Sequence, residues 1–183
     1  MSSRSPVESP DTVSLIIALL VRFPEIASVR SFPADGTVRF SFVTATKLDR
    51  AAQSAVAEVI DEHVGGFLHL GEEQPRDVKV ECETDKGVTF IHVTRDLASF
   101  TKDELLMLVG LLAQRFGDTL VRNPAAEENP DEDPLAQDEL VDYAIDSMRD
   151  PQQQKNLVGF REEKRVLVYF LKSGKKAKAS ARS

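Results

Sequence analysis

Three pairs of short apolar segments, each joined by a tight turn, constrain the fold of this chain more than any other feature. The pairs are residues 26–32 with 37–43, 78–83 with 88–94, and 156–160 with 165–170. The first turn, Pro-Ala-Asp-Gly at residues 33–36, combines a fixed φ, a turn-stabilising carboxylate and a residue that adopts positive φ freely. Apolar and polar residues alternate within the segments, as in Val38, Arg39 and Phe40. Strands joined by such tight turns pair in antiparallel fashion.

Four helices are expected around these hairpins. They are predicted at about residues 10–23, 46–64, 102–116 and 134–150. Thr46 with Asp49 resembles a capping box, and Thr101 with Glu104 is a full one. The glycine pair that follows residue 64 is expected to end the second helix.

The expected order of elements is α-ββ-α-ββ-α-(β)-α-ββ, in which the bracketed strand is residues 119–121. This order predicts an α+β protein with an antiparallel sheet of six to seven strands, built from hairpins and packed against helices. Residues 36–49 and 87–104 are alike, because each has Gly at a turn and Thr before a helix. Two interpretations stay open: an internal duplication of a ββα unit, or the common need of any hairpin and helix for these residue types.

Composition divides the chain into five parts. They are a disordered leader (1–8), the main α+β domain (9–122), an acidic loop (123–134), a C-terminal helix plus hairpin packed on the same domain (135–171), and a basic disordered tail (172–183). Whether residues 135–171 form a separate subdomain stays open at this stage.

Charge and cysteine content exclude several classes of protein. The formal net charge of −7 argues against a protein that coats nucleic acid with its whole surface. The single cysteine rules out an intramolecular disulfide and favours a cytoplasmic location. Residues 13–21 are apolar but too few to cross a bilayer, so we expect a buried helix there and no membrane segment.

The sequence contains no familiar catalytic or cofactor-binding motif, and we predict no catalytic residue, cofactor or metal. His63 is expected to interact with a helix end, and His69 has no potential ligand at a suitable spacing. Cys82 and His92 lie on paired strands. They share a face if the intervening turn has three residues, and lie on opposite faces if it has two or four. The acidic run at 131–133 lacks the Gly and Glu of a calcium-binding loop.

Charge is separated along the chain, and this separation is the strongest functional signal. Residues 124–150 carry ten acids and one base, whereas residues 172–183 carry five bases and no acid. A short basic tail can bind phosphates without sequence specificity; it can also solubilise the terminus or fold back onto the acidic segment. The candidate nucleic-acid-binding residues are Arg161, Lys164, Arg165, Lys172, Lys175, Lys176, Lys178 and Arg182.

The first helix and the helix at 102–116 are more apolar than a single layer of helices on a sheet requires. Either another element covers them or one of them forms a homodimer interface. Phe40, Phe42 and Phe90 alternate with polar residues as core side chains do, so no basic surface with exposed rings is indicated.

We therefore expect a non-catalytic cytoplasmic protein-interaction or assembly protein that self-associates, with a protein partner or homo-oligomer and no membrane. Two alternatives stay open. One is an accessory RNA- or ribosome-binding protein that uses the C-terminal hairpin and the basic tail. The other is an enzyme of unrecognised class.

Overall fold

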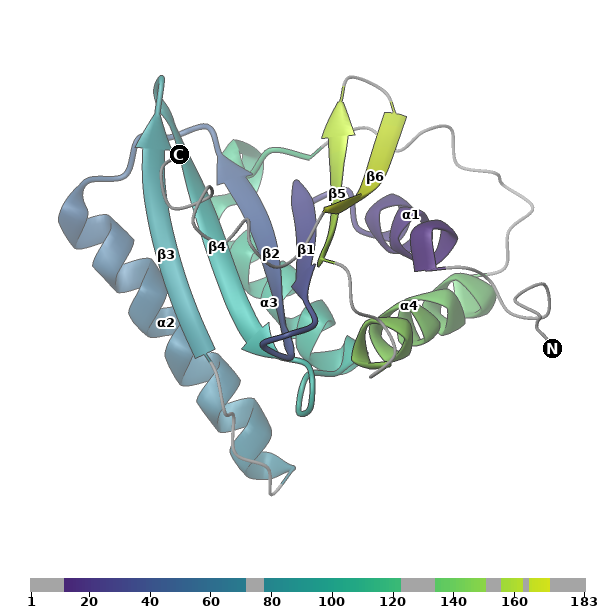
Figure 1. Cartoon of the computed structure of the whole chain (residues 1–183). Helices are drawn as coiled ribbons and strands as arrows, with labels where there is room; N and C mark the ends of the chain where they lie inside the picture. The colour runs from purple at the N-terminus through teal and green to yellow at the C-terminus, as the bar shows by residue number, and fades with distance from the viewer. Residues whose placement is uncertain (1–11, 72–77, 123–133, 151–155, 163–164, 172–183) are drawn as a thin grey trace, which may run out of the picture.

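The computed structural model describes residues 12–71, 78–122, 134–150, 156–162 and 165–171. Its helices are α1 (Thr12–Arg22), α2 (Arg50–Leu70), α3 (Lys102–Phe116) and α4 (Pro134–Arg149). Its strands are β1 (Ser28–Phe32), β2 (Thr37–Thr44), β3 (Val78–Asp85), β4 (Val88–Asp96), β5 (Asn156–Glu162) and β6 (Arg165–Leu171). These elements form an α+β protein with one antiparallel sheet, as predicted (Figure 1).

The three predicted hairpins are present and join into a six-stranded sheet of order β3-β4-β2-β1-β5-β6. The first two hairpins meet through β2 and β4, and β5 pairs with β1, so the C-terminal hairpin extends the same sheet. The predicted strand at 119–121 contributes only an isolated bridge between Leu120 and Thr44, after a turn of 3₁₀ helix. The meeting of β2 with β4 is compatible with a duplicated ββα unit, which stays a prediction.

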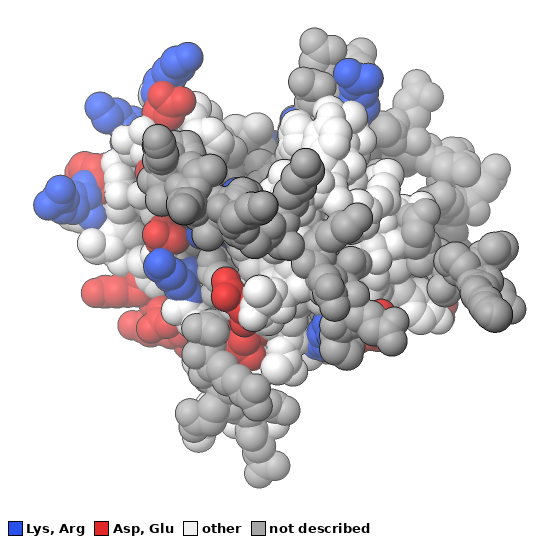
Figure 2. Space-filling view, viewed as in Figure 1, with Lys and Arg blue, Asp and Glu red and all other residues white. Residues whose placement is uncertain are grey.

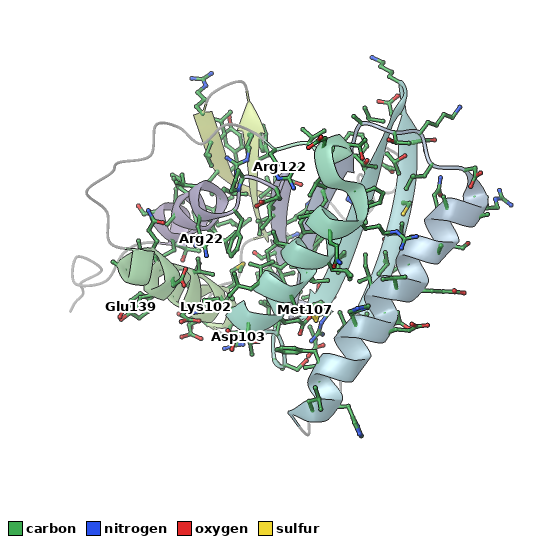
Figure 3. All side chains as sticks on the ribbon, turned by 180° about the vertical axis from the view of Figure 1, so that it is seen from behind. Arg22, Lys102, Asp103, Met107, Arg122 and Glu139 are labelled. Carbon is green, nitrogen blue, oxygen red and sulfur yellow. The ribbon has the colours of Figure 1, made fainter. Side chains whose placement is uncertain are left out.

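All four described helices cover one face of the sheet, and the core lies between the two layers (Figure 3). On β2 the side chains of Val38, Phe40 and Phe42 point to the helices and are fully buried. On α3 the residues spaced by three and four, Leu105, Leu108 and Leu112, are buried against them. The alternating strand pattern and the helical period therefore specify the same core.

Helix α4 covers the apolar surface of α1. The two helices run antiparallel, with the Thr12 and Ser147 hydroxyls 2.6 Å apart at one end and Arg22 Nε donating to Asp138 Oδ1 at 2.9 Å at the other. Between these contacts Leu15, Ile16 and Leu19 of α1 and Val141, Ala144 and Ile145 of α4 are buried. A second element of the same chain thus covers part of the apolar surface of α1, which is one of the two interpretations left open by the sequence; a homodimer interface stays a prediction.

Helix α2 begins later and ends later than predicted. Asp49, not Thr46, is the N-cap, and its carboxylate accepts the Ala52 N–H at 2.8 Å. The helix continues through the glycine pair to Leu70, with Gly71 as its C-cap. Burial of Val64 and Leu68 continues the spacing by four along the helix, and this packing outweighs the low helix propensity of glycine. His69 therefore lies in the helix, not in a connector.

Gly159 on β5 allows α1 to pack closely against the sheet. A Cβ atom at this position would lie 2.7 Å from Ile16 Cγ2 and 3.1 Å from Leu20 Cδ1. We expect Gly159→Ala to lower the free energy of unfolding by about 1–3 kcal/mol, because the α1 side chains must shift. In the control Gly110→Ala, on the exposed side of α3 with no atom within 4 Å, we expect a gain of about 0.5–1 kcal/mol. Urea unfolding measures the free energy of unfolding of both variants. Equal changes would mean that the close approach of α1 to Gly159 does not affect stability.

Candidate functional site

The face of the sheet opposite the helices is the candidate functional site, because none of the four described helices lies over it (Figures 1 and 3). One row of side chains across this open face, from β3 to β6, is Lys79, Thr94, Arg39, Arg30, Val158 and Tyr169. The next row is Glu81, His92, Ser41, Ser28, Phe160 and Leu167. Figure 2 shows charged side chains gathered on the β3 side of this face and mostly uncharged atoms over β5 and β6. The open face is thus charged at one side and apolar at the other.

Two arginines face each other at the middle of the open face. Arg30 on β1 is the register partner of Arg39 on β2, and both guanidinium groups lie over the ring of Phe32, at 5.4 and 5.8 Å from its centroid. Arg39 also contacts Glu81 at 3.6 Å. Like charges directly opposite one another on neighbouring strands destabilise a sheet, so this pair calls for an explanation.

His92 lies on the same face, between a serine and a glutamate. Its Nδ1 is 2.7 Å from Ser41 Oγ, and its Nε2 is 3.6 Å from Glu83 Oε1. A serine within hydrogen-bond distance of a histidine is one element of nucleophilic catalysis. The pair lies on two adjacent strands of an open sheet, where it also satisfies the two side chains as an ordinary cross-strand hydrogen bond.

Cys82 and His92 point to opposite faces of the sheet. Asp85 pairs with Val88, so the turn has two residues, and Cys82 pairs with Ile91 while His92 pairs with Glu81. Cys82 therefore packs on the helix side, where burial raises the pKa of its thiol. A joint active site of these two residues is excluded.

The same register corrects the prediction for Phe90. Phe40 and Phe42 are core residues as predicted, but Phe90 is paired with Val43 and lies on the open face, stacked on His92 with ring centroids 6.2 Å apart. The alternation along β4 is strict, but it places Thr89 and Ile91, not Phe90, toward the helices. Rings and arginines therefore do share the open face, contrary to the expectation from the sequence.

A buried charged cluster at the end of β4 is the most elaborate polar arrangement in the part of the chain that is described. The Arg95 guanidinium donates to Glu104 through two parallel bonds of 2.6 and 2.8 Å, and also to Asp96. Arg95 and Glu104 have no exposed side-chain surface. Ser99 donates its backbone N–H and its hydroxyl to Asp96, at 3.0 and 2.7 Å. The cluster ties the start of α3 to the end of β4, which is a structural role.

The burial of this cluster changes the pKa of Glu104. Desolvation raises the pKa of Glu104 above its ordinary value, against the opposing effect of Arg95. Glu104 was expected to complete a capping box. Thr101 does accept the Glu104 N–H, at 3.2 Å, but the Glu104 carboxylate turns inward to Arg95.

The predicted nucleic-acid-binding residues fall into three groups. Arg161 points to the helix side, where its guanidinium donates to the carbonyls of Ile26 at 3.1 Å, Phe23 at 2.9 Å and Leu20. Burial lowers the pKa of Arg161, and its donors are occupied by the end of α1. Arg165 is exposed at the start of β6. The remaining candidates, Lys164, Lys172, Lys175, Lys176, Lys178 and Arg182, lie outside the described residues.

The acidic segment is partly neutralised where it is described. On α4, Asp138 pairs with Arg22, Asp142 pairs with Lys102 at 3.3 Å, and Asp146 pairs with Arg149. His63 donates a hydrogen bond from Nδ1 to the Val59 carbonyl, 2.7 Å away, within α2. Within the described ranges, no group of three His, Cys, Asp or Glu residues is arranged to hold a metal ion, and no helix is long and apolar enough to cross a membrane. The acidic run at 131–133 lies outside these ranges.

Comparison with protein-family models, with curated proteins and with solved structures finds no match to this chain. The open face and the sheet edges are therefore interpreted from their own chemistry. Sequence reasoning predicted strand β6 but not its position at the sheet edge, and it did not single out Arg30, because the neighbours of both depend on which strands pair.

Proposed function

We propose that this protein is a non-catalytic cytoplasmic interaction protein that self-associates through β6. The supporting observation is the difference between the two edge strands. At the β3 edge, every second residue is charged: Lys79, Glu81, Glu83 and Asp85. Charged residues at an edge are the usual protection against pairing with another chain. From Val166 to Leu171, β6 has no charged residue.

The edge strand β6 is also exposed and self-complementary. Tyr169 and Phe170 are 50% and 42% exposed, although both are aromatic. No described strand pairs with the outer side of β6. An antiparallel pairing of β6 with itself, centred on Val168, places Leu167 opposite Tyr169 of the second copy. Arg165 then lies opposite Leu171 of the second copy, so the two arginines do not face each other.

Self-association is tested by the mass of the protein in solution. We expect light scattering at micromolar concentration to give a mass near twice the 20.3 kDa of one chain. A two-fold strand pairing closes after two copies, so the mass should not rise further with concentration. A monomer mass across the micromolar range would overturn the proposal.

An accessory RNA-binding function is the second candidate, and one observation favours it. Arg30 and Arg39 lie over Phe32 on the open face, and Phe160 lies beside Tyr169 with ring centroids 5.9 Å apart. Rings beside arginines on a sheet are typical of single-strand binding. This candidate predicts RNA binding that weakens with salt and is lost when residues 172–183 are deleted. Electrophoretic mobility shifts at low and high salt measure it, and no binding at low salt would count against it.

A further inference from the structure

Arg30 is a cation whose hydrogen bonding is incomplete. Its Nε is buried and has no hydrogen-bond partner. Its guanidinium forms no ion pair with any described carboxylate, and its contact is with the ring of Phe32 at 5.4 Å. A buried donor without an acceptor costs stability, and the facing Arg39 adds repulsion. An anion bound at Arg30 would reduce both the cost of the unsatisfied donor and the repulsion from Arg39.

Arg39 and Lys79, the other lysine and arginine residues of the two rows, share one carboxylate. Arg39 contacts Glu81 at 3.6 Å and Thr94 at 3.4 Å, and Lys79 contacts Glu81 at 3.7 Å. That carboxylate, Glu81, lies on β3, which β4 and β2 separate from β1. Within the two rows, Arg30 is therefore the cation that contacts no described carboxylate, and it lies between the charged side at β3 and the apolar side at β5.

We propose that Arg30 binds a carboxylate of an extended acidic segment of a partner polypeptide. Guanidinium groups bind carboxylates through two parallel hydrogen bonds. A rotation of the partly buried Arg30 side chain that presents Nε to the carboxylate would supply the acceptor that Nε lacks. Val158, the register partner of Arg30, and Phe160 offer apolar contact to the side chains that flank the carboxylate. The proposal concerns a surface separate from the β6 edge, so it stands or falls independently of self-association.

A polypeptide fits this site better than a nucleic acid does. A single-stranded nucleic acid carries a negative charge at every nucleotide, and would meet Glu81 and Glu83 when it crosses the face. A peptide with one carboxylate at Arg30 and apolar neighbours toward β5 avoids those carboxylates. The charge pattern of the face therefore favours isolated acids over a continuous polyanion.

The test is a titration of the full chain, ¹⁵N-labelled, with an acetylated and amidated pentapeptide of alternating Val and Glu. The same peptide with Gln in place of Glu is the matched probe. The Arg30 Nε–H resonance should shift and saturate with the Glu peptide, at an affinity at least about tenfold higher than with the Gln peptide, as the loss of a charge-assisted hydrogen bond implies. The shift of neighbouring amides should disappear in Arg30→Gln and persist in Arg22→Gln, because Arg22 is paired with Asp138 at the α1–α4 contact (Figure 3).

Arg30→Lys is the second variant. It keeps the charge but not the two-pronged geometry, and it should bind the Glu peptide more weakly while its amide spectrum stays that of the folded protein. The proposal is overturned if no saturable shift occurs, or if the Glu and Gln peptides bind equally. It is also overturned if a ten-nucleotide single-stranded RNA binds Arg30 more tightly than the Glu peptide does, which would assign the site to nucleic acid.

Discussion

Replacing Glu104 by alanine is expected to lower the free energy of unfolding by about 3 kcal/mol. Glu104 is fully buried and receives two hydrogen bonds from the fully buried Arg95. Its removal leaves a buried guanidinium with Asp96 as its remaining described carboxylate. For a chain of this size, the corresponding fall in melting temperature is roughly 6–12 °C.

The neighbouring Asp103 is the matched control. It is also an acid in the first turn of α3, but its side chain is exposed. Asp103→Ala should cost at most about 1 kcal/mol, through its interaction with the helix dipole. Urea unfolding of both variants measures the difference. Equal losses would show that the pair with Arg95 contributes no more than an exposed helix charge does.

The pH dependence of the same site gives a second readout. Because burial raises the pKa of Glu104 above its ordinary value of 4.5, the native state binds more protons than the unfolded state between 4.5 and the raised pKa. The contribution of Glu104 to stability is therefore full below 4.5 and declines as the pH rises through the folded pKa. Glu104→Gln lacks this dependence, so the stability difference between wild type and Glu104→Gln should narrow as the pH rises from below 4.5 through the raised pKa of Glu104. A stability difference that widens with rising pH would mean that Arg95, not burial, determines the direction in which the pKa of Glu104 is shifted.

The hairpins were predictable because their signals are local. The turn at 33–36 and the alternation of Val38 and Phe40 specify adjacent antiparallel strands without reference to the rest of the chain. Local signals did not give the length of the second turn, and a difference of one residue there decides which face carries Cys82, Phe90 and His92. The error for Phe90 concealed the ring-bearing open face.

Contacts between distant segments could not be predicted from local patterns. The pairing of β1 with β5 joins residues separated by more than a hundred positions, and it places Val158 beside Arg30. The lack of an ion pair between Arg30 and any described carboxylate likewise depends on the neighbouring strands, since the sequence around Arg30 resembles that around Arg39. Helix α2 shows the same limit, because packing of Val64 and Leu68 continues the helix past two glycines that usually end one.

Replacing Tyr169 by lysine is expected to convert the proposed dimer into a monomer. In the pairing centred on Val168, Tyr169 lies opposite Leu167 of the second copy, and the two-fold axis repeats each substitution twice. Loss of about 1–1.5 kcal/mol of apolar contact at each of two positions corresponds to a rise in the dissociation constant of roughly thirtyfold or more. Lysine is also the residue that natural edge strands use most to prevent pairing.

Tyr143→Lys is the matched control for this variant. Tyr143 lies on α4 and is 53% exposed, close to the 50% of Tyr169, so the two substitutions change composition and exposed area alike. Light scattering over a range of concentrations should show a dimer for wild type and Tyr143→Lys, and a monomer for Tyr169→Lys at the same concentrations. Unchanged melting curves for the monomeric variant at low protein concentration would show that the fold is intact, since Tyr169 points away from the helices. A dimer that survives Tyr169→Lys would remove β6 from the interface, because the pairing would place the lysine of each copy opposite Leu167 of the other.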